Sequence, residues 1–172
     1  ESSSLGKTKN INHFFSKLNY NLDLKNFESS DLSISIERVN NDSYLKVFEA
    51  NIYDSLVKPK NQDALNSELK IDLDHDEYNL SMGFQSFENL QLGNNDRYQF
   101  ILPYYNFNKN IFEDFNKGRI SFNSQGSNDL NFTNNLNSKI INNFNFNGNE
   151  IITKKGIINN VNISLKNLNS LG

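Results

Sequence analysis

The residues that come closest to a recognisable chemistry are residues 72–76, where Asp stands at every second position. A calcium-binding loop begins in the same way, because carboxylates at alternate positions converge on the ion. Such a loop then needs a Gly where this chain has Glu77, and a bidentate Glu where it has Gly83. We therefore expect this stretch to be the charged tip of a hairpin and to bind no metal.

Other catalytic and metal-binding patterns are incomplete. His13 and His75 have no His or Cys partner at the spacing of a zinc site, and the chain contains no cysteine. Asp74 and Asp76 could pair as in a glycoside hydrolase, but the sequence offers no apolar pocket that would give the two carboxyl groups different acidities. The chain also lacks a nucleophile elbow, a phosphate loop and a dinucleotide-binding fingerprint. We expect no catalytic residue, no cofactor and no enzymatic activity.

The elements that must position any other site are strands. Tyr98, Phe100, Leu102 and Tyr104 alternate with other residues, so a strand would place them on one face as an aromatic stripe. Pro103 cannot donate a hydrogen bond to a neighbouring strand, and we expect it at a sheet edge, at a bulge or where pairing is interrupted.

The same alternation of apolar and polar residues recurs along the whole chain and predicts about eight to ten strands. The clearest examples are residues 18–24, 32–36, 69–73, 78–84 and 161–165. Short polar turns separate them, so neighbouring strands must be antiparallel and form a meander. We also expect a short strand at residues 43–48, a loop at 108–115, a turn at Asn128-Asp129, and a hairpin turn at either Asn147-Gly148 or Lys155-Gly156.

The composition excludes several classes of protein. Hydrophobic residues make up 36% of the chain, so a wet interior is expected. The net charge is -3 and no basic cluster occurs, which argues against binding to nucleic acid. Asn makes up roughly a fifth of the residues, as an AT-rich genome would encode, so an Asn-rich run is not by itself a binding code.

A transmembrane barrel and a soluble sandwich both fit the alternation. A soluble sheet turns one face to its core and the other to water, whereas a barrel turns its apolar face to lipid and its polar face to the lumen. Two features favour the barrel: the apolar positions are mostly Tyr, Phe and Leu, and the chain has only two alanines. The alternative stays open, namely a soluble β-sandwich or adhesin-like module that binds glycans through its Asn- and Tyr-rich face.

Five segments occur in an order that resembles a known family: residues 41–46, 63–67, 74–80, 85–90 and 96–105. They resemble the β-barrel part of the lipopolysaccharide-assembly outer-membrane protein family, LptD, in its alphaproteobacterial members. A strand ending in a Tyr-Leu pair, an Asp-x-Leu-x-Ser segment, a hairpin and a strand containing Leu-Pro carry the likeness. The residues that match these motifs are Tyr44, Leu45, Asp96, Arg97, Tyr98, Leu102 and Pro103.

The resemblance implies a function in the outer membrane of a Gram-negative bacterium. Members of the family receive lipopolysaccharide from periplasmic bridge proteins and insert it into the outer leaflet, with a plug lipoprotein seated in the barrel. Lipopolysaccharide, the plug lipoprotein, the bridge proteins and the outer membrane are the implied partners. Pro103 would be either a weak point of a lateral gate or a proline at the barrel rim.

The chain is expected to be a fragment. Residues 1–172 would form part of a single barrel domain, without the signal peptide, the periplasmic jellyroll domain and the remaining strands. The first residues, 1–7, lack the charged and apolar regions of a signal peptide. The expected fold is therefore all-β, an antiparallel meander that forms part of a transmembrane β-barrel.

Overall fold

The computed structural model describes residues 12–52, 54–114 and 117–172, and the N-terminal residues 1–7 discussed above lie outside these ranges. Within them, ten strands and three short helical segments occur. The elements are β1 His13–Asn21, β2 Ser29–Val39, α1 Tyr44–Val47, α2 Glu49–Ile52, β3 Ala64–His75, β4 Tyr78–Asn89, η1 Asn94–Arg97, β5 Tyr98–Asp114, β6 Gly118–Asn131, β7 Asn135–Asn147, β8 Ile151–Ile152, β9 Ile158–Asn159 and β10 Asn162–Leu171. None of the helices in the described ranges is long and apolar enough to cross a membrane.

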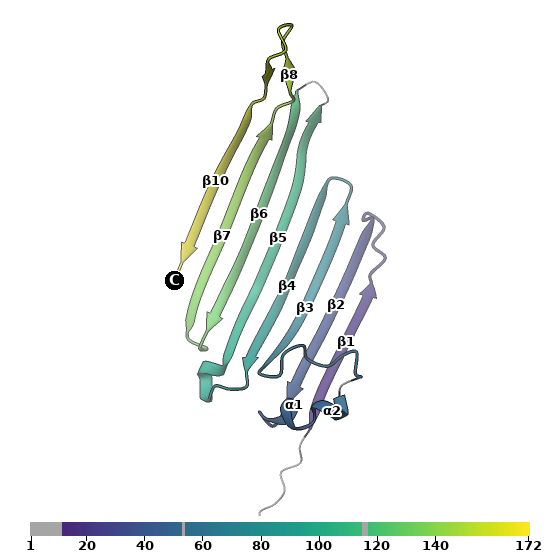
Figure 1. Cartoon of the computed structure of the whole chain (residues 1–172), viewed down its shortest axis with the longest axis vertical. Coiled ribbons are helices and arrows are strands. Elements are labelled where there is room, and N and C mark those ends of the chain that lie inside the picture. The colour runs from purple at the N-terminus through teal and green to yellow at the C-terminus, as the bar shows by residue number, and fades with distance from the viewer. Residues whose placement is uncertain (1–11, 53, 115–116) are drawn as a thin grey trace, which may run out of the picture.

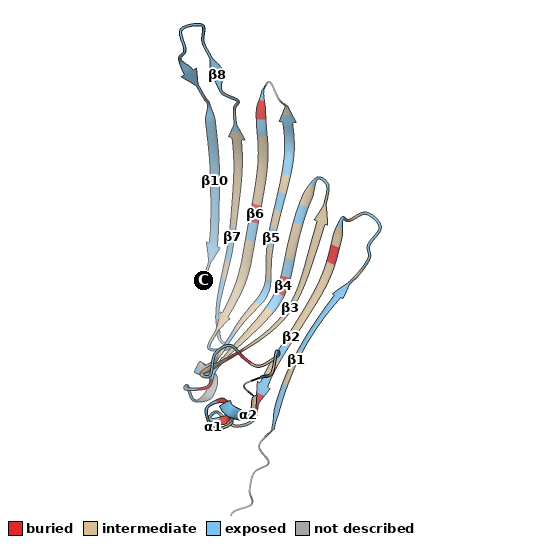
Figure 2. Cartoon of the chain, turned by 45° about the vertical axis from the view of Figure 1, so that its right-hand side comes forward, coloured by how far each residue is buried: buried red, intermediate tan, exposed pale blue. Residues whose placement is uncertain are grey.

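Eight of these described strands form one antiparallel meander in the order β1-β2-β3-β4-β5-β6-β7-β10 (Figure 1). The all-β antiparallel meander predicted from the alternation is thereby confirmed. Strand β5 is 17 residues long, and it extends together with β6 and β7 beyond the β3–β4 hairpin (Figure 1). The sheet is curved, and its strands are mostly exposed or half-buried (Figure 2).

Three local predictions are wrong. Residues 43–48 form the helix α1 and not a strand. The loop expected at 108–115 is strand as far as Asp114, and the turn expected at Asn128-Asp129 lies inside β6. The chain reverses instead at Phe132 and Thr133, which have positive φ angles of 54° and 61°. Residue 115 itself lies outside the described ranges.

The choice between two turns near the C-terminus is settled by the β8–β9 hairpin. Gly156 has φ of 77°, and its N–H donates to the Thr153 carbonyl at 2.9 Å, so the chain reverses there. Gly148 does not form the turn, because its N–H donates to the carbonyl of Val161 at 2.7 Å and keeps the two segments side by side. The hairpin is therefore longer than an Asn-Gly turn would have made it.

A small core lies at the end of the sheet that carries α1 and α2 (Figure 2). The buried hydrophobic residues of the described chain are Val39, Tyr44, Leu45, Leu65 and Leu90. Burial of such side chains contributes about 1.5–3 kcal/mol each, so this cluster fixes the helical segment to the sheet. The centres of the strands contain no comparable core.

Candidate functional site

The two faces of the sheet differ in chemistry, because residues directly opposite each other on neighbouring strands share a face. One row crosses five strands on the apolar face, and a second crosses five strands on the polar face. The apolar row is Tyr20, Leu32, Ile71, Met82 and Tyr105. The polar row is Asp74, Asn79, Asn108, Asn123 and Asn143. Below, "apolar face" and "polar face" mean the faces that carry these two rows.

The apolar face stays exposed in the middle of the strands. The exposed fraction is 51% for Leu18, 49% for Phe84 and 63% for Leu165, which lie on the first, a central and the last strand of the sheet. Among the described residues no second sheet covers this face, since the other sheet is only the β8–β9 hairpin. An apolar surface of this extent calls for lipid or another protein layer.

The polar face is held together by hydrogen bonds between strands. The Tyr104 hydroxyl of β5 donates to Glu68 of β3 at 2.6 Å, and Gln85 of β4 donates to Asn66 of β3 at 3.2 Å. Within β3, Lys70 pairs with Asp72 at 2.8 Å. At the end near α2, Lys60 and other residues of the connecting loop line a hollow together with Lys17 and Glu68. Residues 60–61, which follow the helical segment, therefore lie on the polar side of the sheet.

Pro103 lies at a bulge in β5, an interior strand. Ile101 is opposite Gln85, and Tyr104 is opposite Gly83, so two residues of β5, Leu102 and Pro103, stand against one residue of β4. The pairing with β6 shifts at the same place, shifts again between Asn110 and Phe112, and continues to Asp114. The prediction of a bulge is confirmed, and pairing does not end at this proline.

The bulge changes which residues share a face. Ile101 lies opposite Gln85, and Tyr104 lies opposite Gly83. Gln85 and Gly83 are two residues apart in β4 and both lie on the polar face, so Tyr104 points to the polar face as well. Tyr105 points to the apolar face instead. The predicted stripe of Tyr98, Phe100, Leu102 and Tyr104 is therefore wrong at Tyr104, because one extra residue reverses the alternation.

Tyr104 and Tyr105, which follow the bulge, pack against glycines on opposite faces of the sheet. The Tyr104 ring lies so close over Gly83 that an added Cβ would come within 2.8 Å of its Cζ. On the other face, a Cβ at Gly126 would come within 2.5 Å of Cε1 of Tyr105, whose hydroxyl is 3.1 Å from Ser124 Oγ. Glycines in strands often mark such close approaches.

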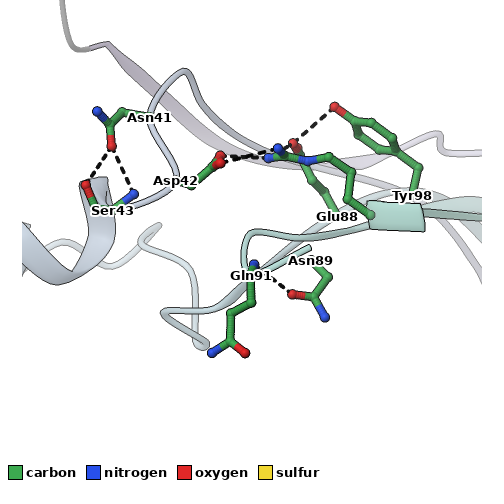
Figure 3. Close-up of polar contacts among 8 residues, drawn as sticks. Asn41, Asp42, Ser43, Glu88, Asn89, Gln91 and Tyr98 are labelled. Atoms are coloured by element: carbon green, nitrogen blue, oxygen red, sulfur yellow. Dashed lines mark hydrogen bonds and ion pairs between the residues drawn. The ribbon is translucent and has the colours of Figure 1, made fainter. Parts of the chain in front are cut away.

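Arg97, in η1, contacts two of the segments that carry the resemblance, through Asp42 and Glu88. Figure 3 shows Asp42, Glu88 and Tyr98 close together. The Arg97 guanidinium lies 2.8 Å from Asp42 and 2.6 Å from Glu88. Tyr98 begins β5 and donates its hydroxyl to Glu88 at 3.2 Å. The hydrogen bond and the charge of the two carboxylates raise the pKa of Arg97 further above its ordinary value. Asp96, beside it in η1, is exposed.

Tyr44 and Leu45, the other motif residues, are buried in α1 and not at the end of a strand. The Tyr44 hydroxyl is 2.5 Å from His13 Nδ1, and its ring packs on His13 and Phe48. The next residue, Lys46, forms an ion pair of 2.6 Å with Asp63. These contacts attach α1 to β1 and to the start of β3.

The Asp-rich tip of the β3–β4 hairpin is an ordered turn. Asp74 accepts a hydrogen bond from Asn79, and the His75 ring stacks on Tyr78 with 4.7 Å between ring centres. In the ranges that the structure describes, no group of three or more His, Cys, Asp or Glu residues could hold a metal ion. Asp72 also pairs with Lys70, and Glu77 pairs with Lys109, so these carboxylates stabilise the hairpin and its contact with β5.

Two signals for the missed features are present in the sequence. Tyr44, Phe48 and Ile52 follow one another at intervals of four, which is the period of a helix. The adjacent aromatic residues Tyr104 and Tyr105 cannot both belong to one stripe of a regular strand, so this doublet indicates a shift of phase.

No protein-family model, curated protein or solved structure matches this chain.

Proposed function

We propose that this chain is part of the wall of a transmembrane β-barrel in the outer membrane of a Gram-negative bacterium. The apolar face carries the proposal, because it crosses all eight strands of the described sheet and stays exposed at their centres. In a barrel this face contacts lipid, and the polar face lines a wet lumen.

The strands and edges support the same role. The strands of the large sheet are 9 to 17 residues long, and about 9–11 tilted residues suffice to cross the hydrocarbon layer. Among the described strands, β1 and β10 each pair on one side only. Further strands of the same barrel would pair with both edges and close it.

We further propose that the barrel inserts lipopolysaccharide into the outer leaflet, with a plug lipoprotein and periplasmic bridge proteins as partners. This part rests on the motif residues described above. Arg97 supports it, because it joins the segment before Tyr44 and Leu45 to the start of β5. The bulge at Pro103 supports a weak point within the wall, since the pairing of β5 is interrupted there toward both neighbouring strands, β4 and β6.

Two adjacent residues of β4 test the membrane part of the proposal. Met82 lies on the apolar face and Ser81 on the polar face. In lipid vesicles, Met82→Arg should lower the free energy of unfolding by about 2–4 kcal/mol, and Ser81→Arg by only about 0–1 kcal/mol. Urea titration of both variants in vesicles measures the difference.

Detergent dependence separates the barrel from a soluble sandwich. Met82→Arg would also destabilise a soluble sandwich, because this residue would then face a protein core. The wild-type protein should need detergent to stay in solution. A detergent-free monomer that unfolds cooperatively would refute the membrane role.

Depletion of the full-length protein tests the lipopolysaccharide part. Surface lipopolysaccharide should fall while other outer-membrane barrels continue to assemble. Unchanged surface lipopolysaccharide after depletion would refute this part and leave the membrane role standing.

A further inference from the structure

Four Asn residues form a connected amide ladder on the polar face of β5, β6 and β7. They are Asn106, Asn108, Asn123 and Asn143, and Asn108, Asn123 and Asn143 lie directly opposite one another. Neighbouring strands are about 4.8 Å apart, so the amides repeat at that spacing across the sheet.

The ladder is made of direct side-chain hydrogen bonds. Nδ2 of Asn123 donates to Oδ1 of Asn106 at 3.3 Å and also to Asn108. Asn143 donates to Asn123 at 3.5 Å. Asn108 also donates to Oδ1 of Asn106 at 3.5 Å. Each amide has two N–H donors and an oxygen that accepts two bonds, so these contacts leave two donors on Asn106 and both a donor and an acceptor on Asn108, and both residues are exposed.

A hollow of about 380 Å³ adjoins the ladder, where the β3–β4 hairpin ends and β5 and β6 continue (Figure 1). Asn108 and Asn123 line it together with Asn79 and Arg119. Its lining also includes the carboxylates of Glu28, Asp74, Asp76 and Glu77. Asn79 donates to Asp74, Arg119 Nε donates to Asn110 at 3.0 Å, and Lys109 pairs with Glu77 at 3.2 Å. The volume of the hollow lies within the range of small-ligand sites, about 300–1,000 Å³.

We propose that the amide ladder and this hollow bind a hydroxyl-rich saccharide chain. A sugar hydroxyl both donates and accepts, as an amide does, whereas a phosphate only accepts and would favour cations. The four ladder residues are neutral, and the four carboxylates that line the hollow accept hydrogen bonds from sugar hydroxyls but repel a phosphate. The cations of the hollow, Lys109 and Arg119, already have partners in Glu77 and Asn110. The inference deepens the proposed function, on which it rests for the source of the saccharide, by assigning the sugar part of lipopolysaccharide to this end of the polar face.

Titration of the full chain in detergent micelles tests the site with two soluble probes. One is the polysaccharide released from purified lipopolysaccharide by mild acid, and the other is dextran. The wild-type protein should bind the first probe, and Asn108→Ala with Asn123→Ala should weaken binding about tenfold or more, since each lost hydrogen bond contributes roughly 0.5–1.5 kcal/mol. Asn123→Ser keeps a hydroxyl and should weaken it less.

Asn135→Ala is the matched control, because Asn135 also lies on the polar face of β7 but near its other end, opposite Asn131. It should leave binding unchanged, and thermal unfolding of every variant checks the fold. Binding of dextran as well would support a general saccharide site. Absence of binding by the wild-type protein, or equal weakening by Asn135→Ala, would show that the ladder only stabilises the sheet.

The two proposals fail in different ways. A protein that binds the polysaccharide but is a detergent-free monomer keeps the saccharide site and loses the membrane role. A protein that needs detergent but binds neither probe keeps the membrane role and loses the site.

Discussion

Gly83 is a residue where the sheet leaves no room for a side chain. A Cβ there would come within 2.5 Å of the Leu69 carbonyl and 2.7 Å of the Tyr104 hydroxyl. The carbonyl belongs to the backbone of β3 and cannot rotate away. We expect Gly83→Ala to lower the free energy of unfolding by about 1–3 kcal/mol, as overpacking does.

Gly93→Ala is the control for this prediction, because nothing lies within 4 Å of an added Cβ there. It should change the free energy of unfolding by less than about 0.5 kcal/mol. Urea titration of both variants in vesicles gives the comparison, and equal effects would contradict the close approach of Tyr104 to Gly83.

Arg97 is the residue whose loss should loosen the end of the sheet that carries η1. Its side chain and that of Glu88 are only 16% and 17% exposed, so Arg97→Ala would leave a largely desolvated carboxylate without its cation. We expect a loss of about 1–3 kcal/mol in the free energy of unfolding. Arg97→Lys should recover part of it, since it keeps the charge but not the two-pronged contact.

Lys70→Ala serves as the control, because Lys70 and Asp72 are 36% and 39% exposed. An exposed pair contributes about 0–1 kcal/mol. If Arg97→Ala cost no more than Lys70→Ala in the same titration, the Arg97 contacts would be ordinary surface pairs.

At the scale of elements, the bulge in β5 is removable in principle. Deletion of Pro103 would leave Leu102 opposite Phe84, and every later residue of β5 would keep its face. We expect this variant to fold with a regular ladder and slower hydrogen exchange at Phe84 and Asn128. Faster exchange or a misfolded barrel would show that the bulge is needed for the fold.

The same deletion tests the gate. If the bulge is a weak point through which lipid leaves, the full-length variant should assemble and yet deliver less lipopolysaccharide to the surface. A Ser81→Ala variant in the adjacent strand is a control that should leave delivery unchanged. Normal delivery of lipopolysaccharide by the variant without the bulge would show that Pro103 is not a gate residue.

The segment from α1 to the start of β3 should respond to acid. Lys46 and Gln91 donate hydrogen bonds that lower the pKa of Asp63. Because the pKa of Asp63 is lower in the folded protein, ionised Asp63 stabilises the attachment of this segment at pH values above its unfolded-state pKa, about 3.9. This stabilisation is lost as the pH falls through the folded-state pKa.

Hydrogen exchange of residues 43–63, corrected for intrinsic rates, measures this response. Protection should be constant between about pH 7 and 5 and should fall only below about pH 4. Asp63→Asn should remove the pH dependence. Loss of protection near neutral pH would assign the attachment to other groups.

The sequence predicted the meander because strict alternation, as in residues 78–84, is a property of each strand alone. It did not predict α1, because Tyr44 and Leu45 are buried by contacts with Leu65 and Leu90, far away in the chain. It placed Pro103 at an interruption, since proline lacks an N–H. The face of Tyr104 depends on which residue is the extra one, and only pairing with β4 and β6 decides that.

At the scale of the whole molecule, the sheet ends in two unpaired strands, β1 and β10, among the described elements. Detergent covers the apolar face but does not pair an open strand edge. We expect the 172-residue chain in micelles to associate edge to edge. Light scattering coupled to gel filtration would detect the oligomers.

Lysines on the edge strand should oppose this association. Asn167→Lys with Asn169→Lys on β10 should shift the chain toward a monomer, because charge on an edge disfavours pairing. Asn145→Lys, on β7 between two paired neighbours, should not. A wild-type monomer in micelles would mean that the edges are covered in some other way.

The bulge at Leu102 and Pro103 also determines where β5 can tolerate the insertion or deletion of a residue. Insertion of one codon elsewhere in β5 would turn every following side chain to the opposite side, exchanging tyrosines and phenylalanines for asparagines across half the strand. At the bulge, one codon more or less alters only the size of the irregularity. Scanning β5 with single-residue insertions should therefore find tolerance concentrated at residues 102–103 and at residue 111, where the pairing with β6 shifts a second time.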